Sequence, residues 1–390
     1  MRGRSGWQDN EGDMTGKLTR RAALLTGLAA AAPAFARAPQ AVERPMPRGM
    51  AARPVSGDTL VRQAGLTGQA AFVVADTASG EVLDAVAPDV GLPPASTLKA
   101  VTSLYALDRL GPDWRYRTGV YATGPLENGI VQGDLVLAGS GDPTMDTDRL
   151  LLLAEATAAR GVKGVTGRFL VWDGYLPDLD YLAEGQPEQV GYNPAVSGLN
   201  LNFNRVHFSW ERTGSGYDVE IVARGLKAAP DAGRLARVAV ADRAGPVYEY
   251  HGNQMGRDQW SVARSALGKE GSRWLPVREP GLYCGHIFQE LAAAEGVRLP
   301  TVTMSDVEPR GGVRLASVSG QRMRDVLREM MRYSTNLTAE VTGMTASLAG
   351  GAEVGDLPAS GAAMKTGPRN ATACGASRSR ITRALATTRG

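Results

Sequence analysis

The chain has 390 residues, which is long for one ordinary domain and favours either two domains or one domain with a large insertion. Hydrophobic residues make up 43% of it and charged residues 21%, as is typical of a globular protein with an aqueous surface. Lysine plus arginine number 43 against 40 acids, and no dense basic stripe runs through the middle of the chain, so nucleic acid is not expected as a partner.

The N-terminal region has the pattern of an export signal. After Met14, three cationic side chains precede a short apolar stretch over residues 22–32, and small residues at 34–38 offer a cleavage site. An apolar stretch this short cannot cross a bilayer about 30 Å thick as a helix. We therefore expect residues 1–38 to comprise an N-terminal extension and a cleaved signal, no transmembrane anchor in the mature chain, and a periplasmic location.

The type of signal and its start are left open by the sequence. Arg20-Arg21 resembles part of a twin-arginine signal, and a Sec signal with adjacent arginines is the alternative. Met14 is a second candidate for the initiator beside Met1, because residues 1–13 are polar and precede the usual start of such a signal. Residues 39–55 are rich in Pro, Ala and Arg and are expected to form a flexible lead-in.

A β-hairpin followed by a helix is predicted next. Two short apolar runs, 70–76 and 81–86, flank a turn that contains Gly80. Two prolines then interrupt the chain. From Ser96 onward apolar residues recur at helical spacing, and Gly111-Pro112 is expected to end this helix.

The middle of the chain, residues 113–300, reads as a mostly β region. Short strand-like runs are separated by Gly, Asp and Pro, for example at 129–137, 168–172 and 217–222. Helical character returns near 282–295. We interpret this region as a large insertion.

A strongly amphipathic helix is predicted before residue 333. Its apolar positions follow the spacing i, i+3, i+4, i+7 and i+8 and are expected to face the core. These positions are Met323, Val326, Leu327, Met330 and Met331. The helix leads into Tyr333-Ser-Thr-Asn336.

Ser96 and Lys99 form the first candidate for chemistry. A serine hydroxyl is a weak nucleophile until a base removes its proton, and residues three apart share one face of a helix. A buried lysine has a lowered pKa and can then act as that base in its neutral form. The alternative is an N-cap serine beside a solvated lysine, which is the common reading of Ser-x-x-Lys alone.

Further motifs carry a family resemblance. Ser96-Thr-Leu-Lys99 and Ser334-Thr-Asn336 resemble the first two signature motifs of penicillin-recognising enzymes. The chain resembles the D-alanyl-D-alanine carboxypeptidase/endopeptidase family of penicillin-binding protein 4 type, peptidase family S13. The resemblance lies in the sequence segments 93–100, 137–144 and 334–340 and in the long gap between the two motifs.

The resemblance implies an α+β fold. It would have a serine β-lactamase/transpeptidase-like domain, with helices packed on an antiparallel sheet, interrupted by a large mostly β inserted domain. The expected boundaries place the first part of the catalytic domain at 56–112, the insertion at 113–300 and the second part at 301–363. Residues 364–390 are expected to be an aberrant, disordered tail that leaves the catalytic domain C-terminally incomplete.

The resemblance also implies the roles of the site residues. Ser96 would attack the penultimate D-Ala carbonyl of a muropeptide, and Lys99 would be the base. Ser334 would relay a proton to the leaving amine, and Asn336 would hydrogen-bond the substrate or Lys99. The implied partners are peptidoglycan muropeptides ending in D-Ala-D-Ala, with β-lactams as covalent inhibitors. No cofactor and no metal is expected.

The third family motif, Lys-Thr-Gly on an edge strand, is matched only by Lys365-Thr-Gly367. Lys365 and Thr366 would bind the substrate carboxylate if this motif is genuine. The flanking residues show no strand alternation, and the arginine-rich residues after Gly367 have the composition of a disordered segment. A shifted reading frame after about Ala363, a genuine short-spaced motif and natural divergence are the alternatives.

Two other functions are open at this point. One is a non-catalytic, truncated homologue that binds peptidoglycan or a partner, and the other is a β-lactamase. Carboxypeptidase and endopeptidase action cannot be separated from the sequence. The two cysteines, Cys284 and Cys374, could pair in an oxidising compartment.

Overall fold

The computed structural model describes residues 55–366, and the chain divides into two compact units between Val90 and Gly91. In the first unit, helix α2 (Gly57–Gln63) precedes an antiparallel hairpin of β1 (Phe72–Ala75) and β2 (Val82–Val86). The Asp76 carboxylate closes the turn by accepting backbone N–H bonds from Ala78 and Ser79 at 2.9 and 2.7 Å. The predicted hairpin is thus confirmed, whereas the predicted export signal lies outside the described residues.

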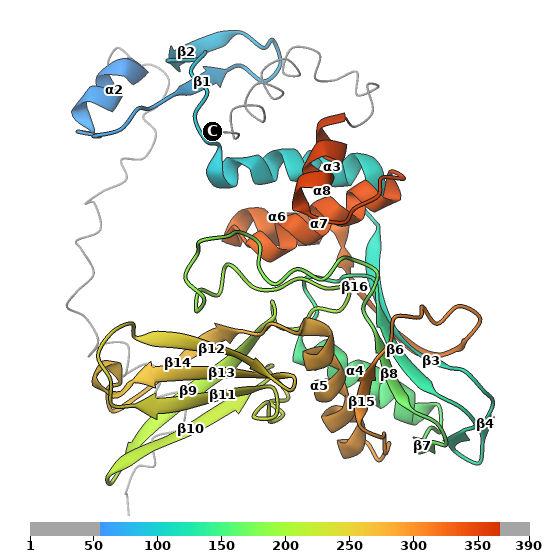
Figure 1. Ribbon diagram of the computed structural model, residues 1–390. Helices are drawn as coiled ribbons and strands as arrows, with labels where there is room; N and C mark the ends of the chain where they lie inside the picture. Colours follow the sequence, from blue (N-terminus) through green and yellow to red (C-terminus); the bar gives the residue numbers. More distant parts are fainter. Residues whose placement is uncertain (1–54, 367–390) are drawn as a thin grey trace, which may run out of the picture. The chain divides into compact units, whose positions relative to one another are not determined.

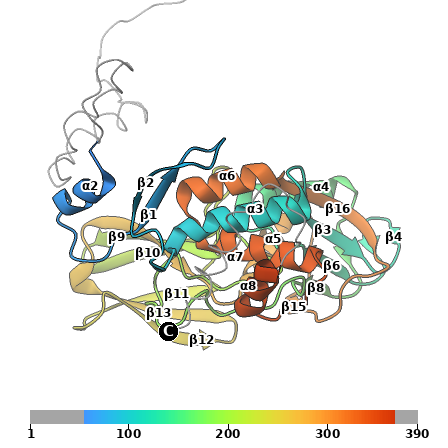
Figure 2. The ribbon, with the colours of Figure 1, turned by 90° about the horizontal axis from the view of Figure 1, so that it is seen from above.

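Four helices of the second unit pack together (Figures 1 and 2). They are α3 (Leu98–Leu110), α6 (Met323–Tyr333), α7 (Asn336–Ala349) and α8 (Leu357–Thr366). The helix predicted from Ser96 begins with a single 3₁₀ turn, Ala95–Thr97, and ends where Gly111 adopts the positive φ of +83° that favours glycine.

Helix α6 has the core face predicted from its sequence. Met323, Val326, Leu327 and Met330 are buried, whereas Met331 is 47% exposed, so the prediction was wrong for that residue alone. The helix turns its remaining, mostly charged side chains to solvent, and its packing therefore depends on one narrow apolar stripe.

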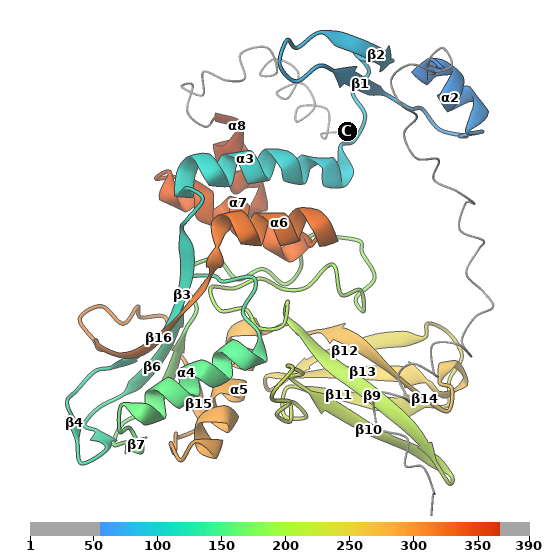
Figure 3. The ribbon, with the colours of Figure 1, turned by 180° about the vertical axis from the view of Figure 1, so that it is seen from behind.

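A five-stranded mixed sheet is the largest of the second unit. Its strand order is β15 (Val302–Met304), β8 (Phe169–Trp172), β6 (Leu135–Gly139), β3 (Arg115–Ala122) and β16 (Val313–Arg322). The pairs β15–β8 and β8–β6 are parallel, and the other two pairs are antiparallel. Helices α4 (Thr147–Ala159) and α5 (Pro280–Ala294) pack against each other beside this sheet (Figure 3).

Three smaller sheets complete the unit. One consists of three two-residue strands, and the other two are three-stranded sheets; the 3₁₀ turn Arg264–Ala266 precedes β14, the last of their strands in the chain. Their strands are β4 (Leu126–Glu127), β5 (Ile130–Val131) and β7 (Gly164–Val165); β10 (Gly216–Val222), β9 (Arg205–Thr213) and β14 (Glu270–Pro276); and β11 (Ala236–Ala241), β13 (Arg257–Ala263) and β12 (Tyr248–Gln254).

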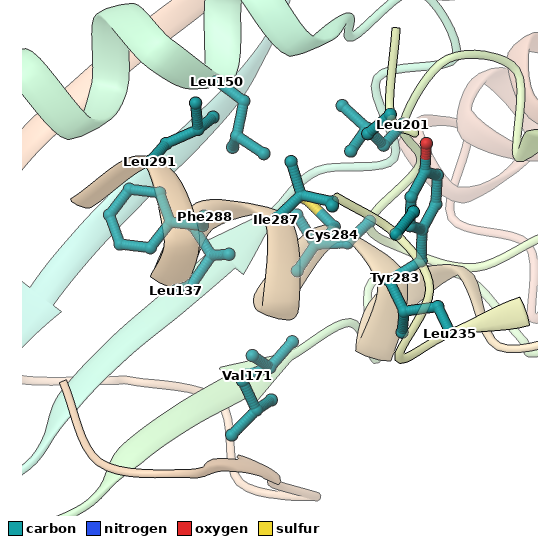
Figure 4. Packing of buried hydrophobic residues seen from close by; sticks show 14 of the residues in the cluster. Leu137, Leu150, Val171, Leu201, Leu235, Tyr283, Cys284, Ile287, Phe288 and Leu291 are labelled. Carbon is teal, nitrogen blue, oxygen red and sulfur yellow. The ribbon is translucent and has the colours of Figure 1, made fainter. Parts of the chain in front are cut away.

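Helix α5 supplies much of the buried core (Figure 4). Ile287 and Phe288 are fully buried, and Gly285 allows the helix to approach the sheet, because a Cβ there would lie 2.6 Å from Val171 Cγ2. Cys284 on the same helix is also fully buried, and burial raises the pKa of its thiol to about 12. Its suggested partner Cys374 lies outside the described residues.

The α+β class and the mostly β character of the inserted region are confirmed. The region contains the predicted α5 and also α4, which was not predicted. The run at 129–137 is two strands, β5 and β6, in different sheets. The last paired strand of the second unit is β16, which ends at Arg322. Outside residues 113–322, the only strand pairing in the described part of the chain is the antiparallel hairpin β1–β2. Strands on both sides of the predicted boundary at 300 and 301 share the five-stranded sheet.

Residues 364–366, which the sequence interpretation gave to the tail, are the last residues of α8. The rest of the predicted tail lies outside the described residues. No helix within residues 55–366 is both long enough and apolar enough to span a bilayer.

Candidate active site

Ser96 lies in the exposed 3₁₀ turn that leads into α3. The residue before it, Ala95, has a φ of +46°, a left-handed conformation that is uncommon for a residue with a Cβ. Pro94 O holds the turn by accepting bonds from the backbone N–H and the hydroxyl of Thr97 at 3.1 and 2.5 Å. The bend presents the Ser96 hydroxyl at the surface while Lys99, one helical turn later, is only 8% exposed.

Four predicted residues come together at this point. Lys99 Nζ lies 3.1 Å from Ser96 Oγ and donates to Asn336 Oδ1 at 2.8 Å. Ser334 Oγ lies 2.9 Å from Ser96 Oγ. The Ser96 hydroxyl is therefore within hydrogen-bond reach of both an amine and a second hydroxyl, which is the arrangement that a nucleophile and its proton carriers require.

Helix packing brings the two distant motif residues to Ser96. Ser334 occupies the turn between α6 and α7 in a left-handed conformation (φ 55°, ψ 40°), and Asn336 is the first residue of α7. Helix α3 packs against both α6 and α7. The sharp turn at Ser334 thus allows its hydroxyl to reach Ser96 Oγ while the Asn336 amide reaches the Lys99 amine.

Two opposing effects act on the pKa of the Lys99 amine. Burial lowers the pKa of the Lys99 amine, since the charged ammonium loses hydration, whereas the nearby Glu340 carboxylate acts in the opposite direction. Burial also raises the pKa of Glu340, and the positive charge of Lys99 counteracts this. Glu340 lies one helical turn after Asn336 on α7, on the face that meets α3.

Two further contributors were not assigned from the sequence. Tyr192 O accepts a hydrogen bond of 3.1 Å from Asn336 Nδ2, and it belongs to the loop that connects β8 and β9. A main-chain oxygen has no sequence signature. Glu340 could have been found, because its i+4 spacing from Asn336 on a predicted helix directs both side chains to one face.

Lys365 and Thr366 lie at the C-terminal end of α8, on a helix and not on an edge strand. Both are exposed, and Thr366 Oγ1 donates to Ala362 O and Ala363 O of its own helix at 3.1 and 3.2 Å. Neither side chain hydrogen-bonds to the Ser96 cluster in the described part of the chain. Their role in substrate binding stays a prediction, and Gly367 lies outside the described residues.

The family model described as D-Ala-D-Ala carboxypeptidase 3 (S13) matches residues 58–355. The D-alanyl-D-alanine carboxypeptidase of Actinomadura sp. (strain R39) is 29% identical over 299 residues, which cover 69% of this chain and 52% of that protein. D-alanyl-D-alanine carboxypeptidase DacB of Haemophilus influenzae is 23% identical over 255 residues, or 63% and 52% of the two chains. The chain spans about half the length of both curated relatives.

Solved structures show the same fold. The crystal structure of penicillin binding protein 4 (dacB) from Haemophilus influenzae superposes with a TM-score of 0.64 at 18% identity and covers 80% of this chain and 70% of that one. The same protein in complex with a novel β-lactam gives a TM-score of 0.63 at 18% identity, covering 80% and 69%. The family model spans well over half of the chain and contains Ser96, Lys99, Ser334 and Asn336, so the chain belongs to the D-Ala-D-Ala carboxypeptidase 3 (S13) family.

Proposed function

We propose that this chain is a serine-type D-Ala-D-Ala carboxypeptidase/endopeptidase that acts on peptidoglycan peptides and is acylated by β-lactams. The observation that supports it is the position of Ser96 Oγ, 3.1 Å from Lys99 Nζ and 2.9 Å from Ser334 Oγ, in a chain of the S13 family. The predicted export signal supports action in the periplasm, which we propose as its location.

Acylation begins when neutral Lys99 accepts the Ser96 proton. Ser96 Oγ then forms a bond to the carbonyl carbon of the penultimate D-Ala, and the carbonyl becomes a tetrahedral oxyanion. The C–N bond to the terminal D-Ala breaks as the oxyanion collapses. Ser334 passes a proton to the leaving nitrogen and receives one from the Lys99 ammonium, so the terminal D-Ala departs as an amine and Lys99 returns to its neutral state.

Hydrolysis reverses the same proton path. A water molecule loses its proton to Lys99 and attacks the Ser96 ester, and the ester bond breaks with return of a proton to Ser96 Oγ. Asn336 keeps the amine in place through both steps, because its Oδ1 accepts from Lys99 Nζ while its Nδ2 is anchored to Tyr192 O. The amide thereby positions the base against the nucleophile.

Two assays on the purified chain test the proposal. A fluorescent penicillin should label the protein covalently in a 1:1 ratio, and a peptide ending in D-Ala-D-Ala should release D-alanine. A peptide ending in D-Ala-L-Ala is the matched control and should release little. Absence of both labelling and release would favour the non-catalytic homologue, and fast turnover of the penicillin would favour a β-lactamase.

Replacing Glu340 with glutamine should shift the acidic side of the pH–rate profile of acylation, where the rate rises with pH, to lower pH. We call this part of the profile the acid limb. The carboxylate stabilises the Lys99 ammonium and so raises the pKa of the amine, and its removal lowers that pKa. The neutral base then exists at more acidic pH, and the rate rises earlier as pH increases. The measurement is the second-order rate constant of penicillin acylation as a function of pH. A range of about pH 5 to 9 is used, because it brackets the pKa values at which catalytic bases ordinarily work.

Glu353→Gln is the control for the loss of one negative charge, because Glu353 is exposed beyond the end of α7. Its acid limb should coincide with that of the unmodified chain. An acid limb that does not move in Glu340→Gln, or moves to higher pH, would show that Glu340 does not stabilise the charged base.

A further inference from the structure

A cavity of about 530 Å³ lies beside the turn that carries Ser334. Tyr333 and Thr335, the two neighbours of Ser334, line it from the helical side, and Phe203, Arg205 and Trp274 line it from the β side. We call this cavity the Arg205 pocket. The proposed mechanism uses none of these side chains, so the cavity needs a separate explanation.

The Arg205 pocket lies next to the candidate active site, because Tyr333 and Thr335 line it and flank Ser334. Gly191 lies so close to Arg205 that a Cβ at that position would be 3.1 Å from Arg205 Cδ. The next residue is Tyr192, whose carbonyl oxygen is bonded to Asn336. A ligand group in the pocket is therefore separated from the Ser96 cluster by a single stretch of main chain.

Arg205 provides an uncompensated positive charge in this cavity. Within residues 55–366 it forms no ion pair, and its Nε is buried without a hydrogen-bond partner. The guanidinium carbon lies 5.3 Å from the Phe203 ring centre and 5.5 Å from that of Trp274, and both rings attract its positive charge. A half-buried guanidinium that contacts aromatic rings and has no ion-pair partner among the described residues can bind an anion.

The other charged residues of the pocket leave this positive charge available. Arg224 also lines the pocket, with Nη1 3.1 Å from His207 Nε2, and it forms no ion pair in the described part of the chain. Asp146 caps α4 by accepting the Arg149 N–H at 2.8 Å. Glu329 on α6 is the remaining acid, and it lowers the affinity of the pocket for anions.

We propose that the Arg205 pocket binds a free carboxylate of the substrate peptide, located on the N-terminal side of the cleaved bond. This inference rests on the proposed function and names the chemical class that its substrate would carry. In peptidoglycan peptides a γ-linked D-glutamyl residue has a free α-carboxylate, and amidation of that group removes the charge. The planar guanidinium offers two parallel N–H groups to a carboxylate, whereas a carboxamide presents a single acceptor.

The test uses the Ser96→Ala protein, so that binding is measured without acylation. The probes are two fluorescent tripeptides, N-acetyl-L-Ala-γ-D-Glu-L-Lys and its D-Glu α-carboxamide twin, both amidated at the C-terminus. Fluorescence anisotropy should show at least about tenfold tighter binding of the carboxylate peptide. Adding Arg205→Met should reduce this ratio to less than about twofold, and Arg205→Lys should leave it in between.

Two further variants control for net charge and for folding. Arg237 is exposed on β11 and does not line the pocket, so Arg237→Met should keep the full ratio. Glu329→Gln leaves Arg205 untouched and should tighten carboxylate binding about threefold, since it removes a negative charge that repels the carboxylate.

Equal binding of the two peptides, or a ratio that persists in Arg205→Met, would overturn the proposal for the pocket. Penicillin labelling of the chain with Ser96 intact is scored separately. Labelling without discrimination between the two peptides would support the proposed function and contradict carboxylate binding in the Arg205 pocket. Discrimination between the two peptides without labelling or D-alanine release would contradict the enzymatic function and support carboxylate binding in the pocket.

Discussion

Ser96→Ala is expected to abolish covalent labelling by a penicillin entirely. Ser96 Oγ is the exposed hydroxyl at the start of α3, and a methyl group in its place leaves nothing to open the β-lactam ring. Intact-protein mass spectrometry should show the acyl adduct on the unmodified chain, and peptide mapping should locate it on the segment that contains Ser96.

The informative control is Ser334→Ala. Its hydroxyl lies 2.9 Å from Ser96 Oγ and is the nearest alternative nucleophile in the described structure. If Ser334 is a proton carrier, its removal should slow acylation by about 10²-fold while the adduct still maps to Ser96. An adduct that appears on Ser334 in the Ser96→Ala protein would reverse the assignment of the two serines.

Lys99→Met should slow acylation by about 10³-fold, which is within the range for loss of a general base. Methionine fills a similar volume in the site, where Lys99 is 8% exposed, so the loss should reflect chemistry more than packing. The measurement is the second-order rate of penicillin acylation, with the melting temperature of each variant compared to show that folding is retained.

Lys99→Arg separates the base from a fixed positive charge. Arginine retains a cation at this position but cannot lose a proton in the working pH range. If Lys99 acts as a base, the arginine variant should be as slow as the methionine variant. A rate near that of the unmodified chain would mean that the site needs only a cation beside Ser96.

Local spacing was sufficient to predict the pairing of Ser96 with Lys99. Residues three apart meet on any helix, and the 3.1 Å distance between Ser96 Oγ and Lys99 Nζ confirms the prediction. The core face of α6 was predictable for the same reason, because period and burial are linked in an amphipathic helix. The meeting of Ser334 and Asn336 with Ser96 was implied only by the family resemblance.

Long-range pairing and main-chain contacts were not accessible from the sequence. The parallel pairing of β8 with β6 and β15 depends on which distant strands share a core, and hydrophobic runs do not encode that choice. Helix α4 was missed, and the strand-like 129–137 run divides between two sheets. Arg205 stood out in no motif, because only folding brings it against Gly191 and close to two aromatic rings.

The bond from Asn336 to the main-chain oxygen of residue 192 has a consequence for how this chain tolerates mutation. Every amino acid has that oxygen, so the side chain at position 192, which is 54% exposed, is free to vary without loss of the bond. Insertions and deletions in the β8–β9 loop are different, since they displace the oxygen itself. Selection at this part of the site should therefore act on the length and path of the loop, and hardly on its composition.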